Sequence, residues 1–259
     1  MSSRPKLSAV LNVHNEEALL RGCLEQLRFC DEILVVLDKC TDGSEAIARE
    51  LADVVLTGSF DLEGQRRNYA IESASGDWLL EVDADEIVTP DLRDELLRVV
   101  ADSPYDVHNV PVHNYVGGNL VLHGWGGNFA PNGKPMLFRR GVKVWKMERV
   151  HPGLEITGKP GPELVHPLIH HVDRNFSDMI RRFDSYTTKR ALDLIDSDQI
   201  GQFPNMVRKI FSRFWKSYVA RKGFREGGYG LVIAIFAAIY PVVSHLKAVE
   251  ELERQKAGL

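Results

Sequence analysis

Cysteine is scarce in this sequence of 259 residues, and the usual signs of an exported or membrane-spanning protein are missing. The three cysteines, Cys23, Cys30 and Cys40, form no metal-ligand pattern, and their odd, low number fits a reducing cytoplasm. The amino terminus runs into an apolar strand pattern without the hydrophobic core of a signal peptide. No stretch reaches the roughly 18–20 apolar residues that a spanning helix needs. We therefore expect a cytoplasmic protein without a transmembrane helix.

Positive charge is also in short supply overall. The formal net charge is −4, which argues against a general nucleic-acid binder. Internal repeats and low-complexity tracts are absent. The remaining composition, 44% hydrophobic and 26% charged, is ordinary for a globular protein. It is enough for one large domain, or for one domain with an appendage.

Strand and helix patterns alternate in the first hundred residues. Strands are expected at 7–13, 33–37, 54–56 and 78–82. Helices are expected between them, at 19–27, 45–51 and 64–73. Such alternation predicts right-handed βαβ units, and hence an α/β fold with a mostly parallel, doubly wound sheet.

The pattern changes after Val100. We expect a strand at 107–115, a long Gly- and Asn-rich loop at 117–135, and a hairpin about Gly141 made by 136–140 and 142–145. A strand at 168–172 then precedes helices from Asp178 onward, with a break near 197–202. The predicted organisation is a main domain at 1–175, with halves 1–102 and 103–175, and a helical extension at 176–259.

Positive charge gathers near the carboxyl end. From Phe203 to Arg225 there are seven Lys or Arg and no Asp or Glu, and apolar residues recur on one side at helical spacing. Such a stripe usually packs on the rest of the protein, but a basic helix with bulky aromatics also suits an anionic membrane surface. The apolar stretch 229–243 follows, and Pro241 is expected to break it. A membrane-docked hairpin or an oligomer interface would use the same surface.

The most informative segment is 78–86, an apolar strand pattern that ends in Asp83, Asp85 and Glu86. Residues two apart on an extended chain share a face, so both aspartates can point the same way. Paired carboxylates suit Mg²⁺ or Mn²⁺, which in turn suits a diphosphate. The plainer interpretation is an acidic strand end before a helix that opens at Thr89.

Three polar clusters follow expected parallel strands, and this context favours a ligand site. They are Asn15 with Glu16, Asp38 with Asp42, and the pair Asp83 and Asp85. The carboxyl ends of parallel strands meet at one edge, where open α/β sheets bind ligands. Asp42 precedes Gly43 and Ser44 and is better explained as a turn and helix cap. Asp38 and Asp83 are expected to contact a ligand.

At this point the sequence resembles the inverting nucleotide-sugar transferases of glycosyltransferase family 2, with the GT-A fold. The matching segments are VLNVHNEE at 10–17, VVLDKCTDGS at 35–44, GQRRN at 64–68, GDWLLEVDADE at 76–86 and LFRR at 137–140. The branch that contains lipopolysaccharide core β-glucosyltransferases is the most similar, because it shares the segment KSYVARKGFREGGYG at 216–230. The resemblance thus covers most of the chain.

The resemblance implies roles in binding a nucleotide diphosphate sugar, with a UDP-sugar favoured. Asn15, Glu16 and Asp38 would hold the nucleoside, with Asp38 on the base. Arg67 in the segment that begins at Gln65 would help to bind the nucleotide. The donor would meet a glycan or lipid-linked acceptor.

The resemblance also implies a divalent metal. Asp83 would lie near the ribose and the metal, and Asp85 would hold the Mg²⁺ or Mn²⁺ that neutralises the leaving diphosphate. A late histidine completes the metal shell in some relatives, and His171 is preferred here over His170. A buried, hydrogen-bonded histidine is the plainer explanation of each ring.

The catalytic base is less evident. Many relatives carry a His-Glu pair where this sequence has His151 and Pro152, so the expected glutamate is missing. Glu148 is favoured over Glu155 because alternate residues of an extended segment share a face; it could equally pair with a neighbouring cation. His151 could orient the acceptor, and Trp125 in the segment 124–127 could belong to an acceptor lid.

The resemblance therefore implies a metal-dependent, inverting hexosyltransferase, with glucose favoured, that acts in cell-envelope glycan synthesis at the inner face of the membrane. Two other functions remain open. A nucleotidyltransferase would need a Gly-rich, basic loop after the first strand, where this chain has an acidic one. A membrane-docked scaffold that binds nucleotide sugar without turnover is supported only by Pro152.

Overall fold

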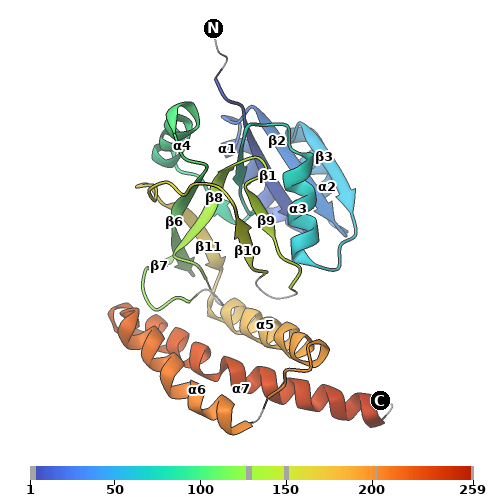
Figure 1. Cartoon of the computed structure of the whole chain (residues 1–259), viewed down its shortest axis with the longest axis vertical. Helices are drawn as coiled ribbons and strands as arrows, with labels where there is room; N and C mark the ends of the chain where they lie inside the picture. The colour runs from blue at the N-terminus through green and yellow to red at the C-terminus, as the bar shows by residue number, and fades with distance from the viewer. Residues whose placement is uncertain (1–3, 127–129, 149–151, 202, 258–259) are drawn as a thin grey trace. The chain divides into compact units, whose positions relative to one another are not determined.

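The computed structural model describes residues 4–126, 130–148, 152–201 and 203–257. Within these ranges the chain forms two compact units (Figure 1). The first contains residues 4–113, 133–148 and 152–170, and the second contains 114–126, 130–132 and 171–257. Residues 114–126 and 130–132 thus fall in the second unit, and the predicted domain division at residue 175 stays a prediction.

A mixed sheet forms the centre of the first unit. Its strand order is β3-β2-β1-β4-β8-β6-β11-β5. The first four are β3 (Val54–Gly58), β2 (Glu32–Asp38), β1 (Leu7–Val13) and β4 (Trp78–Glu81), and they run parallel. The others are β8 (Gly133–Arg139), β6 (Val107–Val116), β11 (Leu168–Asp173) and β5 (Glu86–Ile87), which introduce antiparallel pairs. The predicted doubly wound sheet is confirmed, with its parallel part in the amino-terminal half.

Alternation along the strands makes both faces of the parallel part apolar. One face, with Leu7, Val35 and Leu80, packs against α1 (Glu17–Gln26), α2 (Ser44–Leu51) and α4 (Pro90–Asp102). The other face, with Val10 and Leu79, packs against α3 (Glu63–Ser73). Because side chains alternate between the faces, strands covered on both sides read as nearly continuous apolar runs.

Two predictions for the middle of the chain are wrong. The stretch expected as one loop at 117–135 contains β7 (Asn119–Val121), which pairs with β6, and it includes the start of β8. The strands on either side of Gly141 do not form a hairpin. The first is β8 inside the large sheet, whereas β9 (Lys143–Trp145) pairs with β10 (Leu154–Ile156) in a small sheet of its own.

The second unit is mainly helical. Its helical elements are α5 (Phe176–Asp196), α6 (Phe203–Trp215), a π turn (Lys216–Ala220), a short 3₁₀ helix (Gly223–Glu226) and α7 (Gly227–Ala257). The expected break at Pro241 is wrong, because α7 continues through this buried proline. By length and composition the stretch Gly223–Ala257 is apolar enough to cross a membrane, contrary to the sequence-based expectation. A core helix can have the same character, and 39% of the most apolar window is buried in the protein.

Within the second unit, the segment 216–230 makes hydrogen bonds with the backbone at Gly124. The Ser217 hydroxyl donates to the Gly124 carbonyl over 2.7 Å, and Gly124 donates its backbone N–H to the Arg221 carbonyl over 3.0 Å. Glycine is required where the backbones touch: a Cβ on Gly230 would lie 1.8 Å from the Gly223 carbonyl oxygen. The buried Trp125 donates its indole N–H to the Val121 carbonyl.

Candidate active site

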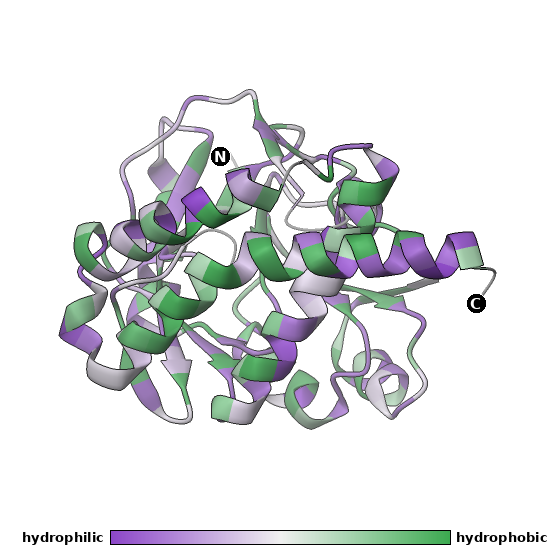
Figure 2. Ribbon diagram, turned by 90° about the horizontal axis from the view of Figure 1, so that it is seen from below, coloured by the Kyte–Doolittle hydropathy of each residue, from purple (hydrophilic) through white to green (hydrophobic). Residues whose placement is uncertain are grey.

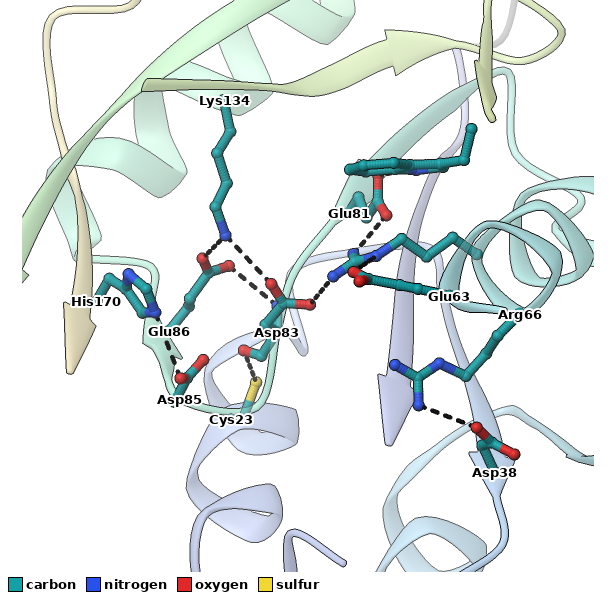
Figure 3. A network of polar contacts seen from close by, with 12 residues as sticks. Cys23, Asp38, Glu63, Arg66, Glu81, Asp83, Asp85, Glu86, Lys134 and His170 are labelled. Carbon is teal, nitrogen blue, oxygen red and sulfur yellow. Dashed lines mark hydrogen bonds and ion pairs between the residues drawn. The ribbon is translucent and has the colours of Figure 1, made fainter. Parts of the chain in front are cut away.

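The carboxyl end of β4 carries the aspartate at the centre of the polar network in Figure 3. One oxygen of Asp83 lies 3.2 Å from Nη2 of Arg67, and the other lies 3.2 Å from Nζ of Lys134. Its backbone N–H donates to Glu86 over 3.0 Å. Burial alone would raise the pKa of Asp83, but the two cations outweigh it and hold the pKa well below its ordinary value.

Arg67 links α3 to two carboxylates at the end of β4. Besides Asp83, it donates to Glu63 and to Glu81, each over 2.7 Å, and its guanidinium lies 4.8 Å from the centre of the Trp145 ring. Three carboxylates thus surround one buried guanidinium. Burial lowers the pKa of Arg67, but the three negative charges dominate and raise it well above its ordinary value.

Glu81 is the charged residue that interrupts the apolar strand, and it is 5% exposed. The Lys143 ammonium lies 2.6 Å from it, and the Trp145 indole N–H donates to the same oxygen over 3.2 Å. Burial raises the pKa of Glu81, but Lys143 and Arg67 outweigh this effect and lower it. A buried carboxylate needs such partners, so the interruption was itself a signal for a hidden cation.

Lys134 was missed by the sequence-based reasoning because its position was assigned to a loop. It lies on β8 and contacts both Asp83 and Glu86. The Glu86 side chain is fully buried. Burial raises its pKa, and Lys134 opposes that rise. The ammonium of Lys134 is therefore the internal counter-ion of two carboxylates from the acidic motif.

Asp85 is placed differently from Asp83. Its side chain is 35% exposed, and one oxygen lies 3.4 Å from Nε2 of His170 on β11 (Figure 3). The pKa of Glu16 is raised, first by burial and then by the charges of Asp85 and Asp83, so these carboxylates share one electrostatic environment. The predicted partner His171 follows His170 on the same strand; it is exposed, and its ring lies 5.5 Å from that of Tyr115.

Within the described ranges, no group of three or more His, Cys, Asp or Glu is arranged to hold a metal ion by itself. Mg²⁺ in phosphate-transfer sites is commonly bound through one or two carboxylates, with waters and substrate phosphates completing the shell. Asp85 fits that role better than Asp83, because both oxygens of Asp83 already face cations.

The carboxyl end of β2 carries Asp38, which is 9% exposed. Its carboxylate accepts from the Phe60 backbone N–H over 3.1 Å and lies 3.3 Å from Nη1 of Arg66. Asn15, with φ of 57°, accepts from the Thr41 backbone N–H over 2.7 Å and so links the loops after β1 and β2.

Asp42 is a turn residue, as the plainer interpretation predicts. Its two oxygens accept from the backbone N–H groups of Ser44 and Glu17, each over 3.0 Å. This leaves Asp38 as the carboxylate at the carboxyl end of β2.

The remaining predicted site residues lie outside this network or outside the described residues. Gln65 is exposed, and its Oε1 accepts from the Leu62 backbone N–H at the start of α3. Glu148 is exposed and accepts from the Gly153 backbone N–H over 3.0 Å. His151 belongs to the stretch that the structure does not describe.

The segment before Glu148 is fastened to α3. The Asn68 side chain makes two hydrogen bonds with the backbone of Trp145, donating to its carbonyl over 2.9 Å and accepting from its N–H over 2.8 Å. Gly64 is also close to this segment, since a Cβ there would lie 2.0 Å from the Lys146 carbonyl oxygen. The strand β9 and the helix that carries Arg67 are thus held together.

These strand ends lie in a region that matches a known family. The sequence model described as "Glycosyl transferase family 2" matches residues 8–150, more than half of the chain. The chain belongs to glycosyltransferase family 2. The predicted α/β fold of the GT-A type, with a helical extension, is confirmed with it.

Relatives of similar length carry names from the same family. The chain is 28% identical over 252 residues to "Lipopolysaccharide core biosynthesis glycosyltransferase LpsC" of Rhizobium meliloti, covering 93% of this chain and 91% of that one. It is 24% identical to an "Uncharacterized glycosyltransferase" of Rickettsia felis, covering 97% and 92%. The predicted resemblance to the lipopolysaccharide core branch is confirmed.

Similarity to solved structures is weaker. A glucosyl-3-phosphoglycerate synthase from Mycobacterium tuberculosis, crystallised with Mn²⁺, uridine diphosphate and phosphoglyceric acid, matches with a TM-score of 0.37 and 20% identity. The match covers 42% of this chain and 43% of the synthase. At this level it carries no argument about the site.

Proposed function

We propose that this family 2 glycosyltransferase moves a hexose, with glucose favoured, from a UDP-sugar to a hydroxyl of a glycan or glycolipid, with inversion at the anomeric carbon. The observation that carries the proposal is the division at the end of β4. Asp83 is neutralised by Arg67 and Lys134, whereas Asp85 stays partly exposed in an acidic environment. The similarity to a lipopolysaccharide core glycosyltransferase supports a role in cell-envelope polysaccharide synthesis.

The proposed nucleoside site lies at the ends of β1 and β2. Asp38 is held in one orientation by Phe60 and Arg66, so its carboxylate is ready to accept hydrogen bonds from a base. Asn15 and Glu16 lie in the loop after β1. Arg67 is occupied by three carboxylates, so we assign it the role of positioning Asp83 at the ribose.

A divalent cation fits this site. Asp85 is the proposed ligand for Mg²⁺ or Mn²⁺, with His170 beside it; burial, and then the negative charges of Asp85 and Asp83, raise the pKa of Glu16. Bound on the diphosphate, the ion would neutralise the charge that develops on the leaving group. Asp83 remains in the proposed site as a support for the ribose.

An inverting transfer needs one base on the acceptor side. As the acceptor oxygen bonds to the anomeric carbon, the bond to the nucleoside diphosphate breaks and the base takes the hydroxyl proton. Glu148 is the proposed base because it is exposed and lies on a segment fastened to α3 by Asn68. His151 remains proposed for orienting the acceptor.

A thermal-shift panel of nucleotide sugars with and without Mn²⁺ tests the donor site. A native-state ligand raises the melting temperature by mass action, and we expect the largest shift with UDP-glucose plus Mn²⁺. Asp85→Asn should remove the Mn²⁺-dependent part, whereas Asp91→Asn, on the exposed start of α4, should keep it. Equal shifts in wild type and Asp85→Asn would refute the metal assignment.

Release of UDP in the presence of acceptor tests the base. Glu148→Gln should abolish transfer while the donor-induced thermal shift persists, and Glu155→Gln, on exposed β10, is the matched control. Unchanged transfer by Glu148→Gln would remove this residue from the role. A protein that binds UDP-sugar and transfers to no acceptor would instead be the scaffold predicted as an alternative.

The proposed location is the cytoplasm, at the inner face of the membrane, where a lipid-linked acceptor would be reached.

A further inference from the structure

Helix α6 carries a row of exposed apolar side chains. Every fourth residue is large, apolar and open to solvent: Phe203 is 46% exposed, Val207 37%, Phe211 77% and Trp215 64%. No residue of α6 is buried. Residues four apart lie on one face of a helix, so these four form a continuous strip, which we call the α6 stripe.

Aromatic contacts extend the α6 stripe beyond the helix. Phe214 stacks on Tyr218 with ring centroids 5.3 Å apart, and Tyr218 meets Phe224 edge-on at 6.4 Å. Phe224 is itself 52% exposed. Figure 2 colours the ribbon by hydropathy and shows hydrophobic residues in the first half of α7, the helix that ends at the label C. The apolar surface thus continues beyond the carboxyl end of α6.

The charged residues from 203 to 225 are all cationic, and at helical spacing Lys209 and Arg213 lie on the side of α6 away from the stripe. Among the described residues, none of the seven cations between 203 and 225 pairs with a carboxylate; they are Arg208, Lys209, Arg213, Lys216, Arg221, Lys222 and Arg225. The carboxylate that follows, Glu226, accepts from the backbone N–H groups of Leu122 and His123 and lies 2.5 Å from the His123 ring. The Glu226 carboxylate is therefore bound by residues of the second unit.

We propose that α6 lies on an anionic lipid surface, with the α6 stripe in the apolar boundary and the cations of the helix and of the segment after it at the headgroups. Bulky aromatics on one face of a helix and Lys or Arg on the other are typical of helices that lie in such a surface. The inference deepens the proposed function and rests on it for one point, that a glycolipid acceptor lies in this surface.

Co-sedimentation of the intact protein with lipid vesicles tests the inference. We expect binding to phosphatidylcholine vesicles that contain phosphatidylglycerol, and weak binding to pure phosphatidylcholine. Phe211→Ala combined with Trp215→Ala should lower partitioning by at least about tenfold. Phe176→Ala, which removes a 43% exposed aromatic on α5, should leave it unchanged.

A second pair of variants tests the charges. Lys209→Gln with Lys216→Gln should lower binding to the anionic vesicles by about fivefold per charge, and added salt should do the same. Lys189→Gln, an exposed cation of α5, is the matched control. Circular dichroism would verify that each variant is folded.

Three outcomes would overturn the inference. They are no binding to anionic vesicles, equal binding by wild type and the Phe211/Trp215 variant, and a fall from dimer to monomer in that variant by sedimentation. Failure of the proposed function would appear elsewhere, as the absence of any thermal shift with nucleotide sugars, and would leave vesicle binding unaffected.

Discussion

Removal of the Lys134 ammonium should destabilise the protein because it leaves Glu86 buried without its cation. The Glu86 side chain is fully buried and that of Lys134 is 23% exposed, so water can replace the lost contact only in part. Breaking a buried ion pair by removing one partner costs about 3–5 kcal/mol, and the partial exposure favours the lower end. For Lys134→Met we expect a loss of about 3 kcal/mol, or roughly 6–12 °C in melting temperature.

A double-mutant cycle separates the charge effect from lost packing. Glu86→Gln combined with Lys134→Met removes both charges and should recover at least about half of the loss. Lys189→Met, at an exposed position of α5, is the control and should change stability by less than about 0.5 kcal/mol. Urea unfolding followed by circular dichroism gives the free energies. A loss under about 1 kcal/mol for Lys134→Met, or no recovery in the double variant, would refute the counter-ion role.

Three further predictions concern packing, thiol reactivity and pH. Gly230→Ala should lower stability by at least about 2 kcal/mol, because its Cβ would lie 1.8 Å from the Gly223 carbonyl oxygen, whereas Gly228→Ala has open space; thermal melting compares them. Burial raises the pKa of Cys23 to about 12, so iodoacetamide at neutral pH should label it only after unfolding, as mass spectrometry would show. Burial raises the pKa of Glu32, but hydrogen bonds from two serines outweigh it and lower the pKa below 4.5. Its stabilisation should therefore be complete above that value and lost as pH falls through the folded pKa, and Glu32→Gln should show a weaker loss in acid melts.

The parallel half of the fold could be predicted because its signals are local. Each strand from β1 to β4 is a short apolar run that ends in a polar turn, and Asp38, Asp83 and Asp85 lie at those ends. Periodicity identifies such elements, and the parallel arrangement then fixes which edge the carboxylates share.

The antiparallel half depends on contacts between distant residues, and the prediction failed there. Nothing local marks β8 as a neighbour of β4, so Lys134 was assigned to a loop although it contacts Asp83. Pro241 was expected to end a helix by its intrinsic preference, but packing overrides that preference in α7. Glu81 was the one available signal, since a charge inside an apolar strand requires a partner from elsewhere.

The two hydrogen bonds between Asn68 and Trp145 have a mechanical consequence. They attach the stretch that leads to Glu148 to α3, the helix that contacts Asp83 through Arg67. A movement of α3 would therefore be passed to this stretch through the Asn68 amide, the contact of Arg67 with Trp145 and the close approach of Gly64 to Lys146. In the proposed reaction, the donor site at Asp83 and the proposed base Glu148 would then move as one body.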